Sequence, residues 1–164
     1  MIKTGIGYDI HQLKEGVPLI VGGVIIESHL GSVGHSDGDG LIHAICDSLL
    51  GAAGLGDIGT FFPSENKKWE NVQSHLFLTE VKKMVLQAGY YVSNIDCTIV
   101  LQKPKLNNYI EEIKKNIANI LDLSEKNICI KATTTDHLGY IGESKGWSVI
   151  AVSTIYSADG KNSH

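Results

Sequence analysis

Near the N-terminus, apolar residues alternate with small or polar ones, and this alternation restricts the fold more than any other feature of the sequence. Ile6, Tyr8 and Ile10 occupy every second position, a period that is typical of a β-strand with one buried face. The pattern therefore predicts that these three side chains face the core. Asp9 and His11 lie between them and share the opposite face of the strand, where both side chains can reach one point.

The rest of the chain changes repeatedly between strand-like and helix-like patterns. Single strands separated by helices, without an internal repeat, predict an α+β fold in which helices pack on one face of a single mixed sheet. We expect one domain over residues 1–164, with an ordered core of about 2–157 and a short C-terminal tail. In the first half of the chain we expect a strand over 2–13, a hairpin over 17–26, a polar loop over 31–40, a helix from 41 that stops at the glycines of 54–59, and a candidate lid over 60–73. In the second half we expect helices over 77–88 and 110–121, strands over 95–101, 128–132 and 147–156, and a turn over 133–136.

Charge and cysteine content exclude several classes of protein. A net charge of -4 without a basic stripe argues against binding of nucleic acid, and no stretch approaches the roughly 18 apolar residues of a membrane span. The N-terminus lacks the basic and apolar regions of a signal peptide, so we expect a soluble protein that is not exported. The three cysteines lie in separate apolar segments and predict reduced, packed thiols. Because no Cys-x-x-Cys pair exists, histidines and carboxylates must hold any metal.

Asp9 and His11 form a candidate metal site together with His43, which lies on the helix that follows. Three ligands leave one coordination position open for water or substrate, as in catalytic zinc sites. Asp47 lies one turn beyond His43 and is placed to accept the second ring N–H of that histidine. The alternative is a solvated aspartate with two hydrogen-bonded histidines, because an arbitrary Asp-x-His pair more often has no metal than binds one.

Two polar segments are candidates for phosphate binding. Gly34–Gly40 precedes a helix N-terminus, where free N–H groups favour anions, although loops of this composition are ordinarily only turns. Thr133–Thr135 with Asp136 offers hydroxyls and a carboxylate for phosphate oxygens and a divalent cation. Consecutive threonines are also plain strand formers, so the residues by themselves leave both interpretations open.

Four motifs in a fixed order carry a resemblance to a known family. They are Gly7–His11 (Gly-Tyr-Asp-Ile-His), His35–Asp39 (His-Ser-Asp-Gly-Asp), Leu50–Gly59 and Lys131–Thr135. Each motif is short, but their order and spacing together resemble those of 2-C-methyl-D-erythritol 2,4-cyclodiphosphate synthase over about residues 2–157.

This resemblance implies a lyase of isoprene biosynthesis by the non-mevalonate pathway. In such an enzyme the 2-phosphate of 4-diphosphocytidyl-2-C-methyl-D-erythritol 2-phosphate attacks the β-phosphate, which closes the 2,4-cyclodiphosphate ring and expels CMP. The reaction requires in-line positioning and charge neutralisation rather than a protein nucleophile. The resemblance further implies a homotrimer with sites shared between neighbouring subunits, in a bacterial cytoplasm or, after removal of a transit peptide, in an organelle stroma.

By the same resemblance, two cations would take part. Zinc or another divalent cation would be held by Asp9, His11 and His43, and Mg²⁺ or Mn²⁺ would bridge the substrate diphosphate. Asp136 is the candidate protein ligand for this second cation.

The resemblance also assigns roles around the substrate. His35 and Thr134 would stabilise the transition state, and Asp57 would hold the erythritol hydroxyls. Residues 62–66 would close over the erythritol unit, and residues 101–107 would form the cytidine pocket, largely through backbone groups. The complete implied substrate-binding set is Asp9, His11, His35, Ser36, Asp57, Ile58, Gly59, Phe62, Pro63, Ser64, Glu65, Asn66, Leu101, Lys105, Leu106, Asn107, Ala132, Thr133, Thr134, Thr135, Asp136 and Tyr140.

Three features, at four positions, depart from the family pattern. Asp136 stands where the family usually has Glu, so it would reach a second cation from farther back or through water. Glu143 and Lys145 exchange the charges of the usual Arg-x-Glu pair, which the family associates with an axial cavity for an isoprenoid diphosphate. Ser64 follows Phe-Pro where an Asp is common.

Two other functions compete with the synthase. One is a metal-dependent nucleotide-diphosphate hydrolase that uses a bound hydroxide. The other is a non-catalytic nucleotide- or metal-binding module, which the shorter Asp136 would favour. A zinc deaminase does not fit, because its His-x-Glu and Cys-x-x-Cys signature is absent from the sequence.

Overall fold

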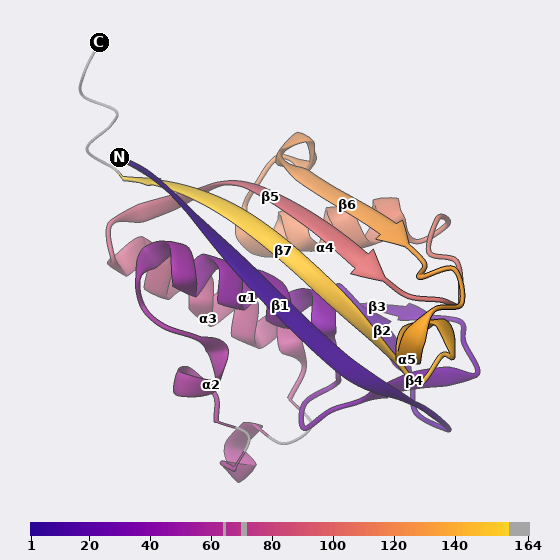
Figure 1. The fold of residues 1–164 in the computed structure, drawn as a ribbon. Helices are drawn as coiled ribbons and strands as arrows, with labels where there is room; N and C mark the ends of the chain where they lie inside the picture. The colour runs from indigo at the N-terminus through magenta and orange to yellow at the C-terminus, as the bar shows by residue number, and fades with distance from the viewer. Residues whose placement is uncertain (64, 70–71, 158–164) are drawn as a thin grey trace.

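A five-stranded mixed sheet forms one layer of the protein, and three long helices pack against one side of it (Figure 1). The computed structural model describes residues 1–63, 65–69 and 72–157. The sheet has the strand order β4-β1-β7-β5-β6, which confirms the predicted α+β class. Its strands are β1 (Ile2–Glu15), β4 (Leu30–Val33), β5 (Tyr90–Val100), β6 (Ile128–Thr133) and β7 (Gly146–Ser157). The helices are α1 (Gly40–Ala53), α2 (Ile58–Phe61), α3 (Ser74–Gln87), α4 (Ile110–Leu121) and α5 (Gly139–Gly142), with 3₁₀ turns η1 (Lys67–Trp69) and η2 (Glu125–Asn127).

Long strands hold the centre of the sheet together. β1 pairs antiparallel with β7 from Ile2 opposite Tyr156 to Gln12 opposite Gly146, and β7 pairs antiparallel with β5 on its other side. The only parallel pair in the described sheet joins β5 to β6, and α4 lies in the crossover between them. Among the described residues, no helix is long and apolar enough to cross a membrane.

Helix α1 lies directly on β1, because β1 presents glycines where the two backbones meet. A Cβ atom added at Gly7 would lie 1.9 Å from the carbonyl oxygen of Ala44, and one added at Gly5 would lie 2.0 Å from that of Ser48. Only glycine permits this approach. The helix begins after Asp39, whose side chain acts as an N-cap by accepting a hydrogen bond from the Ile42 N–H. It ends at Gly54, which has a φ of 73°.

The predicted orientation of β1 is wrong. Ile6, Tyr8 and Ile10 are 70%, 54% and 47% exposed, and they lie on the side of the sheet that carries no helix. Asp9 and His11 are on the covered side instead. The alternation correctly predicted a strand, but a period of two says only that two faces differ. Which face α1 covers was decided by the glycines, which alone let a helix come close.

Smaller differences from the sequence predictions concern the loops. Residues 17–26 do form a hairpin, β2 (Leu19–Val21) and β3 (Val24–Ile26), but as a separate two-stranded sheet. The predicted 31–40 loop is shortened by β4, which pairs with the end of β1. The candidate lid contains the end of α2 and all of η1. Cys46 and Cys97 are buried free thiols as predicted, whereas Cys129 is exposed. Ser64 and the predicted tail at 158–164 lie outside the described residues.

Candidate metal and substrate site

Asp9, His11 and His43 converge beneath the sheet, as the sequence predicted. One ligand atom from each residue lies within 4.8 Å of the others. Asp9 and His11 come from β1, and His43 comes from the first turn of α1. Gly40 gives them room, because a Cβ at this position would lie 2.9 Å from Asp9 Oδ2. The close approach of α1 to β1 therefore places the three ligands around one point.

The polar atoms of this cluster suit a divalent cation. His11 Nδ1 and Asp9 Oδ2 are 2.6 Å apart, yet both are buried and neither makes a properly directed hydrogen bond within the described part of the chain. His43 Nδ1 is 3.7 Å from the same Asp9 oxygen. Buried polar atoms that converge without hydrogen bonds are costly unless a ligand satisfies them. Two imidazoles and one carboxylate are a donor set that zinc accepts.

The charges of the cluster reinforce one another. Burial by itself would raise the pKa of the Asp9 carboxyl, but the imidazoles of His11 and His43 outweigh burial and lower this pKa. Burial would likewise lower the pKa of His43, and the carboxylates of Asp9, Asp39 and Asp37 outweigh it and raise this pKa. The surroundings thus favour the ionised form of Asp9, which is the form that binds a cation.

The outer nitrogen of His43 contacts two serines rather than the predicted Asp47. His43 Nε2 is 2.9 Å from Ser74 Oγ and 3.1 Å from Ser36 Oγ. Asp47 Oδ1 instead accepts a hydrogen bond of 2.7 Å from the Ile58 N–H at the start of α2. The sequence prediction failed because Ser74 is distant in the sequence and reaches His43 only through the packing of α3 against α1.

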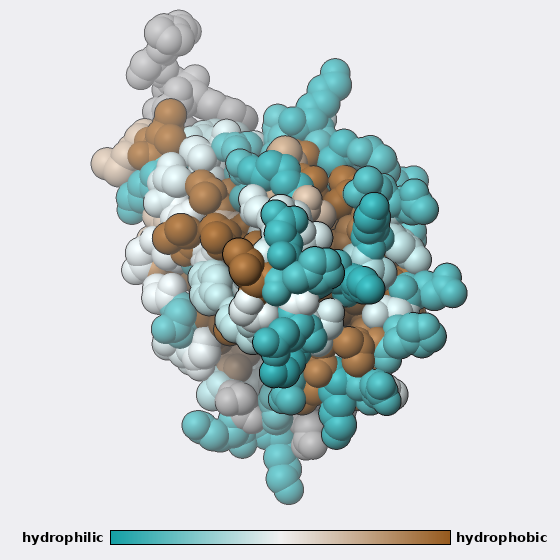
Figure 2. Space-filling view, turned by 45° about the vertical axis from the view of Figure 1, so that its right-hand side comes forward, coloured by the Kyte–Doolittle hydropathy of each residue, from teal (hydrophilic) through white to brown (hydrophobic). Residues whose placement is uncertain are grey.

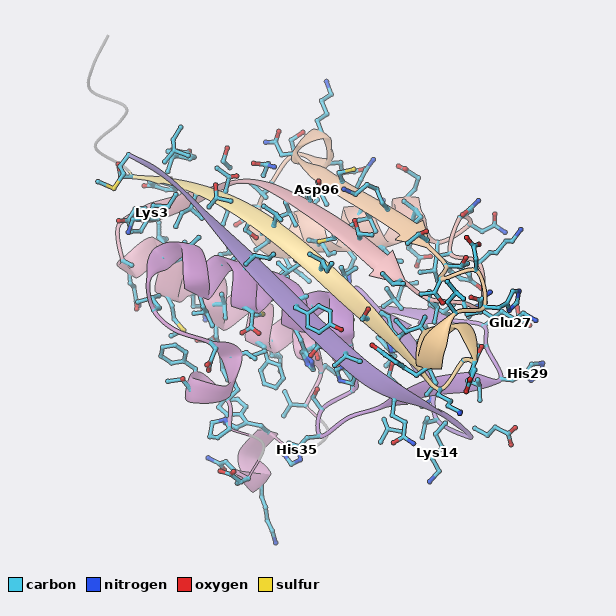
Figure 3. All side chains as sticks on the ribbon, in the orientation of Figure 1. Lys3, Lys14, Glu27, His29, His35 and Asp96 are labelled. Atoms are coloured by element: carbon cyan, nitrogen blue, oxygen red, sulfur yellow. The ribbon has the colours of Figure 1, made fainter. Side chains whose placement is uncertain are left out.

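A cavity of about 360 Å³ opens beside the three ligands. The residues predicted by resemblance that line it are Asp9, His11, His35, Ser36, His43, Ile58, Gly59 and Phe62. His35 lies on the loop before α1, at the end of the molecule where η1 lies (Figure 3). Trp69 and Phe77 also line the cavity, although the sequence predicted no site role for them. The ring centroids of Phe62 and Phe77 are 4.7 Å apart, so aromatic rings wall one side of the site.

The N-terminus of α1 is occupied by a carboxylate of the protein itself, that of Asp39. Asp39 is fully buried, and its carboxylate accepts hydrogen bonds from the N–H groups of Gly22, Gly23 and Ile42. An anion at this helix end would meet a buried carboxylate. Burial raises the pKa of Asp39 to about 6 despite these hydrogen bonds.

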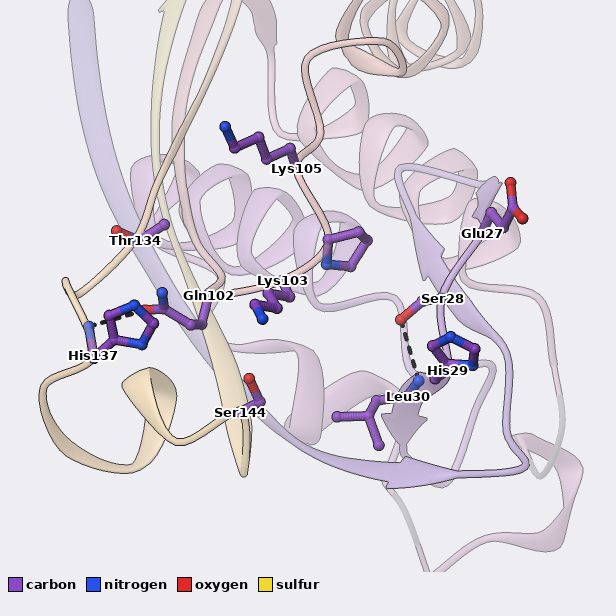
Figure 4. Close-up of a pocket in the computed structure, with 11 residues that line it drawn as sticks. Glu27, Ser28, His29, Leu30, Gln102, Lys103, Lys105, Thr134, His137 and Ser144 are labelled. Atoms are coloured by element: carbon purple, nitrogen blue, oxygen red, sulfur yellow. Dashed lines mark hydrogen bonds between the residues drawn. The ribbon is translucent and has the colours of Figure 1, made fainter.

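A second group of predicted residues lines a different cavity at the ends of β5 and β6. This cavity, of about 200 Å³, is lined by Leu101, Gln102, Pro104, Lys105, Leu106, Asn107, Ala132, Thr133 and Thr134. A larger one of about 930 Å³ adjoins it, and the two share the lining residues Gln102, Pro104, Lys105 and Thr134 (Figure 4). There Gln102 Oε1 accepts a hydrogen bond of 3.2 Å from the His137 N–H. The cavity at the metal ligands shares no lining residue with these two.

Other predicted substrate residues line none of these three cavities: Asp57, Pro63, Glu65, Asn66, Thr135, Asp136 and Tyr140. Asp57 is exposed and caps α2, where hydrogen bonds from Thr60 lower the pKa of its carboxyl. Asp136 accepts a hydrogen bond of 3.2 Å from Thr134 Oγ1. Within the described residues, it belongs to no group of three convergent metal ligands. A cation at Asp136 therefore needs most of its ligands from substrate or water.

Known proteins match nearly the whole chain. Residues 2–156 match the YgbB family. The chain is 49% identical to the 2-C-methyl-D-erythritol 2,4-cyclodiphosphate synthase of Clostridium botulinum strain Hall, over 92% of this chain and 97% of that protein. It is 50% identical to the enzyme of the same name from Clostridium acetobutylicum, over 90% and 95% of the two chains.

Solved structures agree in fold. The chain superposes on the bifunctional IspDF of Campylobacter jejuni with a TM-score of 0.93 and 41% identity, covering 96% of this chain and 42% of that one. It superposes on the CDP complex of Plasmodium falciparum IspF with a TM-score of 0.84 and 37% identity, covering 95% and 96% of the two chains.

Proposed function

The chain belongs to the YgbB family, and from that membership and the geometry of its site we propose that it is a cyclodiphosphate synthase. It converts 4-diphosphocytidyl-2-C-methyl-D-erythritol 2-phosphate to 2-C-methyl-D-erythritol 2,4-cyclodiphosphate and CMP in isoprenoid biosynthesis. An oxygen of the 2-phosphate forms a bond to the β-phosphorus, and the bond from that phosphorus to the bridging oxygen of CMP breaks.

The observation that carries this proposal is the convergence of Asp9, His11 and His43 beside a cavity lined by polar loop residues and aromatic rings. Phosphoryl transfer depends on positioning and on neutralising charge, and the cluster provides a place for that charge. The three residues would hold zinc or a similar divalent cation. When bound, this cation would withdraw negative charge from the phosphate oxygens.

Residues of the chain itself would perform the remaining tasks. His35 lines the cavity on the exposed loop before α1, where its imidazole can donate to a phosphate oxygen as charge develops. Phe62, Trp69 and Phe77 would exclude water from the reacting phosphates. Residues 62–66 would then lie over the erythritol unit, and Asp57 would bind its hydroxyls.

The cavity at the ends of β5 and β6 would bind the cytidine diphosphate part of the substrate. Lys105 supplies a positive charge there, and Thr134 lines both adjoining cavities. The Thr134 hydroxyl would contact the phosphates in the transition state. The second cation, Mg²⁺ or Mn²⁺, would be bound mainly by the substrate diphosphate, with Asp136 as its candidate protein ligand.

Two features support a homotrimer in which neighbouring subunits complete one site. The helix-free face of the sheet exposes Ile6, Tyr8, Ile10 and Ile150, each more than 40% exposed. In addition, one chain distributes the predicted substrate residues over cavities with no common lining residue. Pairing the metal cavity of one subunit with the nucleotide cavity of the next would unite both parts and cover the apolar face.

A complementation experiment tests the shared site. His43→Ala damages the metal cavity and Thr134→Ala damages the nucleotide cavity, so each variant by itself should be inactive or nearly so. When the two are co-expressed, mixed assemblies should contain some sites built from two intact halves and should regain measurable activity. Absence of any recovery in mixed assemblies of confirmed composition would mean that each subunit holds a whole site.

The reaction itself is tested by incubating the protein with the diphosphocytidyl substrate, zinc and Mg²⁺, and recording phosphorus NMR spectra. We expect CMP and a cyclic diphosphate to appear together. The same experiment in oxygen-18 water tests the hydrolase alternative, because hydrolysis labels the product and cyclisation does not. Tight CMP binding without turnover would support the non-catalytic alternative.

The buried free thiols of Cys46 and Cys97 support a reducing compartment, the bacterial cytoplasm or an organelle stroma.

A further inference from the structure

The two ring nitrogens of His43 have different surroundings. Nδ1 faces Asp9 and the candidate cation position, whereas Nε2 points away toward α3. A neutral imidazole carries one hydrogen, and only the nitrogen without hydrogen can bind a cation. The site therefore works only if the hydrogen of His43 is on Nε2. Some group beyond the cluster has to select this tautomer.

Ser74 is the group best placed to do so. Its Oγ is 2.9 Å from His43 Nε2, and the residue is fully buried at the start of α3. The single hydrogen of the Ser74 hydroxyl is donated in a short hydrogen bond to Asp37 Oδ1. A carboxylate accepts hydrogen bonds and donates none. With its own hydrogen committed to Asp37, Ser74 can only accept from His43.

Asp37 also holds the backbone around Ser74. Its Oδ2 accepts a hydrogen bond of 2.9 Å from the Ser74 N–H, and its own N–H donates over 3.3 Å to the Val72 carbonyl. The loop before α1 is thereby fastened to the beginning of α3 by hydrogen bonds to both the backbone and the side chain. This double attachment fixes the position and the direction of the Ser74 hydroxyl.

Ser36 is a second hydroxyl near the same nitrogen, and it differs from Ser74 in an important respect. Its Oγ is 3.1 Å from His43 Nε2 and 3.5 Å from Ser74 Oγ. The described contacts of this hydroxyl do not include a carboxylate that would take its hydrogen. Ser36 is therefore able to donate or to accept, and it does not select a tautomer.

We propose that Ser74, oriented by Asp37, is a positioning residue that accepts the Nε2 hydrogen of His43 and leaves the Nδ1 lone pair directed at the cation site. The proposal deepens the function above and rests on its metal site. It adds two residues, Asp37 and Ser74, to those that prepare the site, and neither is among the substrate or metal residues predicted from the sequence. Outer partners of this kind commonly control the tautomer and the basicity of a metal-binding histidine.

The first test uses metal-free protein and does not depend on activity. Nitrogen-15 NMR of histidine-labelled protein at alkaline pH, above the raised pKa of His43, distinguishes the two neutral tautomers. The signals of His43 are identified by their loss in the H43N variant. We expect the Nε2–H form in the wild type and in S36A. In S74A the acceptor is gone, and in D37N the Ser74 hydroxyl is free to donate to Nε2, so both variants should gain the Nδ1–H form.

The second test measures zinc affinity by competition with a chelator. S74A and D37N should bind zinc about 10-fold more weakly or worse, whereas S36A and the conservative S74T should stay within about 3-fold of the wild type. Backbone amide spectra of each variant establish that the fold is intact. If S74A does not fold, D37N tests the same prediction.

The proposal would be overturned if S74A and D37N both kept the tautomer and the zinc affinity of the wild type. It would also be overturned if S36A lost as much zinc affinity as S74A. The metal site itself is checked with H43A. If H43A keeps full zinc affinity, the proposed metal site fails. If H43A loses zinc while S74A and D37N do not, only the positioning role fails.

Discussion

The two faces of strand β1 differ in side-chain size, in polarity and in whether a helix covers them. On the covered face, Gly5 and Gly7 admit the backbone of α1, and Asp9 and His11 continue the same row into the candidate metal site. On the other face, large apolar side chains project away from the helices, and hydrophobic residues are interspersed with polar ones over this side of the molecule (Figure 2). The face that is chemically polar is buried, and the face that is apolar is open. Close packing against α1 requires small residues on one face, whereas the other face leaves large apolar side chains exposed in the single chain.

The largest effect is expected from adding one methyl group to the covered face. In G7A the new Cβ would meet the Ala44 carbonyl oxygen at 1.9 Å, so α1 would have to move away from β1. We expect a loss of unfolding free energy of at least about 3 kcal/mol, with loss of zinc binding, because overpacking against backbone is hard to relieve.

G51A is the matched control for this change. A Cβ at Gly51 would meet no atom within 4 Å, and the residue lies inside α1. Here alanine should raise the free energy of unfolding by about 0.5–1 kcal/mol, because alanine loses less backbone entropy than glycine when the helix forms. Urea unfolding of both variants measures the difference, and equal stabilities would show that helix and strand are not closely packed.

The next largest effect concerns Asp39, which fastens α1 to the β2–β3 hairpin. Its pKa is raised from 3.8 to about 6 in the folded chain, so the unfolded chain ionises first as the pH rises. Its contribution to stability is therefore complete below pH 3.8 and is lost as the pH rises through about 6. The difference between the two pKa values corresponds to a change in unfolding free energy of roughly 3 kcal/mol at most.

The D39N variant isolates this contribution, because asparagine does not titrate. With metal removed by chelator, the stability of the wild type relative to D39N should fall between pH 4 and pH 7 and then stay constant. Urea unfolding at each pH gives the two curves. Parallel curves would show that Asp39 titrates in the folded chain as it does in the unfolded chain.

Removal of a ligand should affect binding rather than the fold. H43A is expected to lower zinc affinity by at least about 100-fold, since a direct ligand contributes no less than an outer partner. H29A is the control, because His29 is exposed and lines a different cavity. Metal analysis after dialysis measures the outcome. Equal zinc in H43A and the wild type would show that the convergent residues are not the metal site.

The smallest change in the fold itself is expected on the open face. I6D places a charge at a position that is 70% exposed in the single chain, so the monomer should keep its secondary structure and lose less than about 1 kcal/mol. The assembly should nevertheless fall to monomers, because the charge would be buried between subunits.

I25D is its matched control, since Ile25 is 72% exposed but lies on the β2–β3 hairpin. This variant should retain the mass of the wild-type assembly. Light scattering after size exclusion gives both masses. An unchanged mass for I6D would mean that the open apolar face is not the surface through which subunits associate.

The sequence determined the elements of this protein and the position of its candidate metal ligands. Strand and helix periods are local properties, so β1, α1 and α4 could be located from spacing. Asp9 and His11 share a strand face for the same local reason, and His43 follows on the helix next to them. Gly54 likewise marked the end of α1 through its own left-handed backbone conformation.

Only the tertiary structure decided which face of β1 is covered, which side chain contacts the outer nitrogen of His43, and how the predicted substrate residues divide between cavities. Ser74 and Trp69 are remote from the metal ligands in sequence and come near through the packing of α3 and η1. The alternation of Ile6 and Tyr8 predicts a core face because, in a chain that folds alone, apolar side chains face inward. In this fold, the contact between two backbones takes the inward side, and the apolar side chains of the strand lie exposed on the opposite side of the sheet.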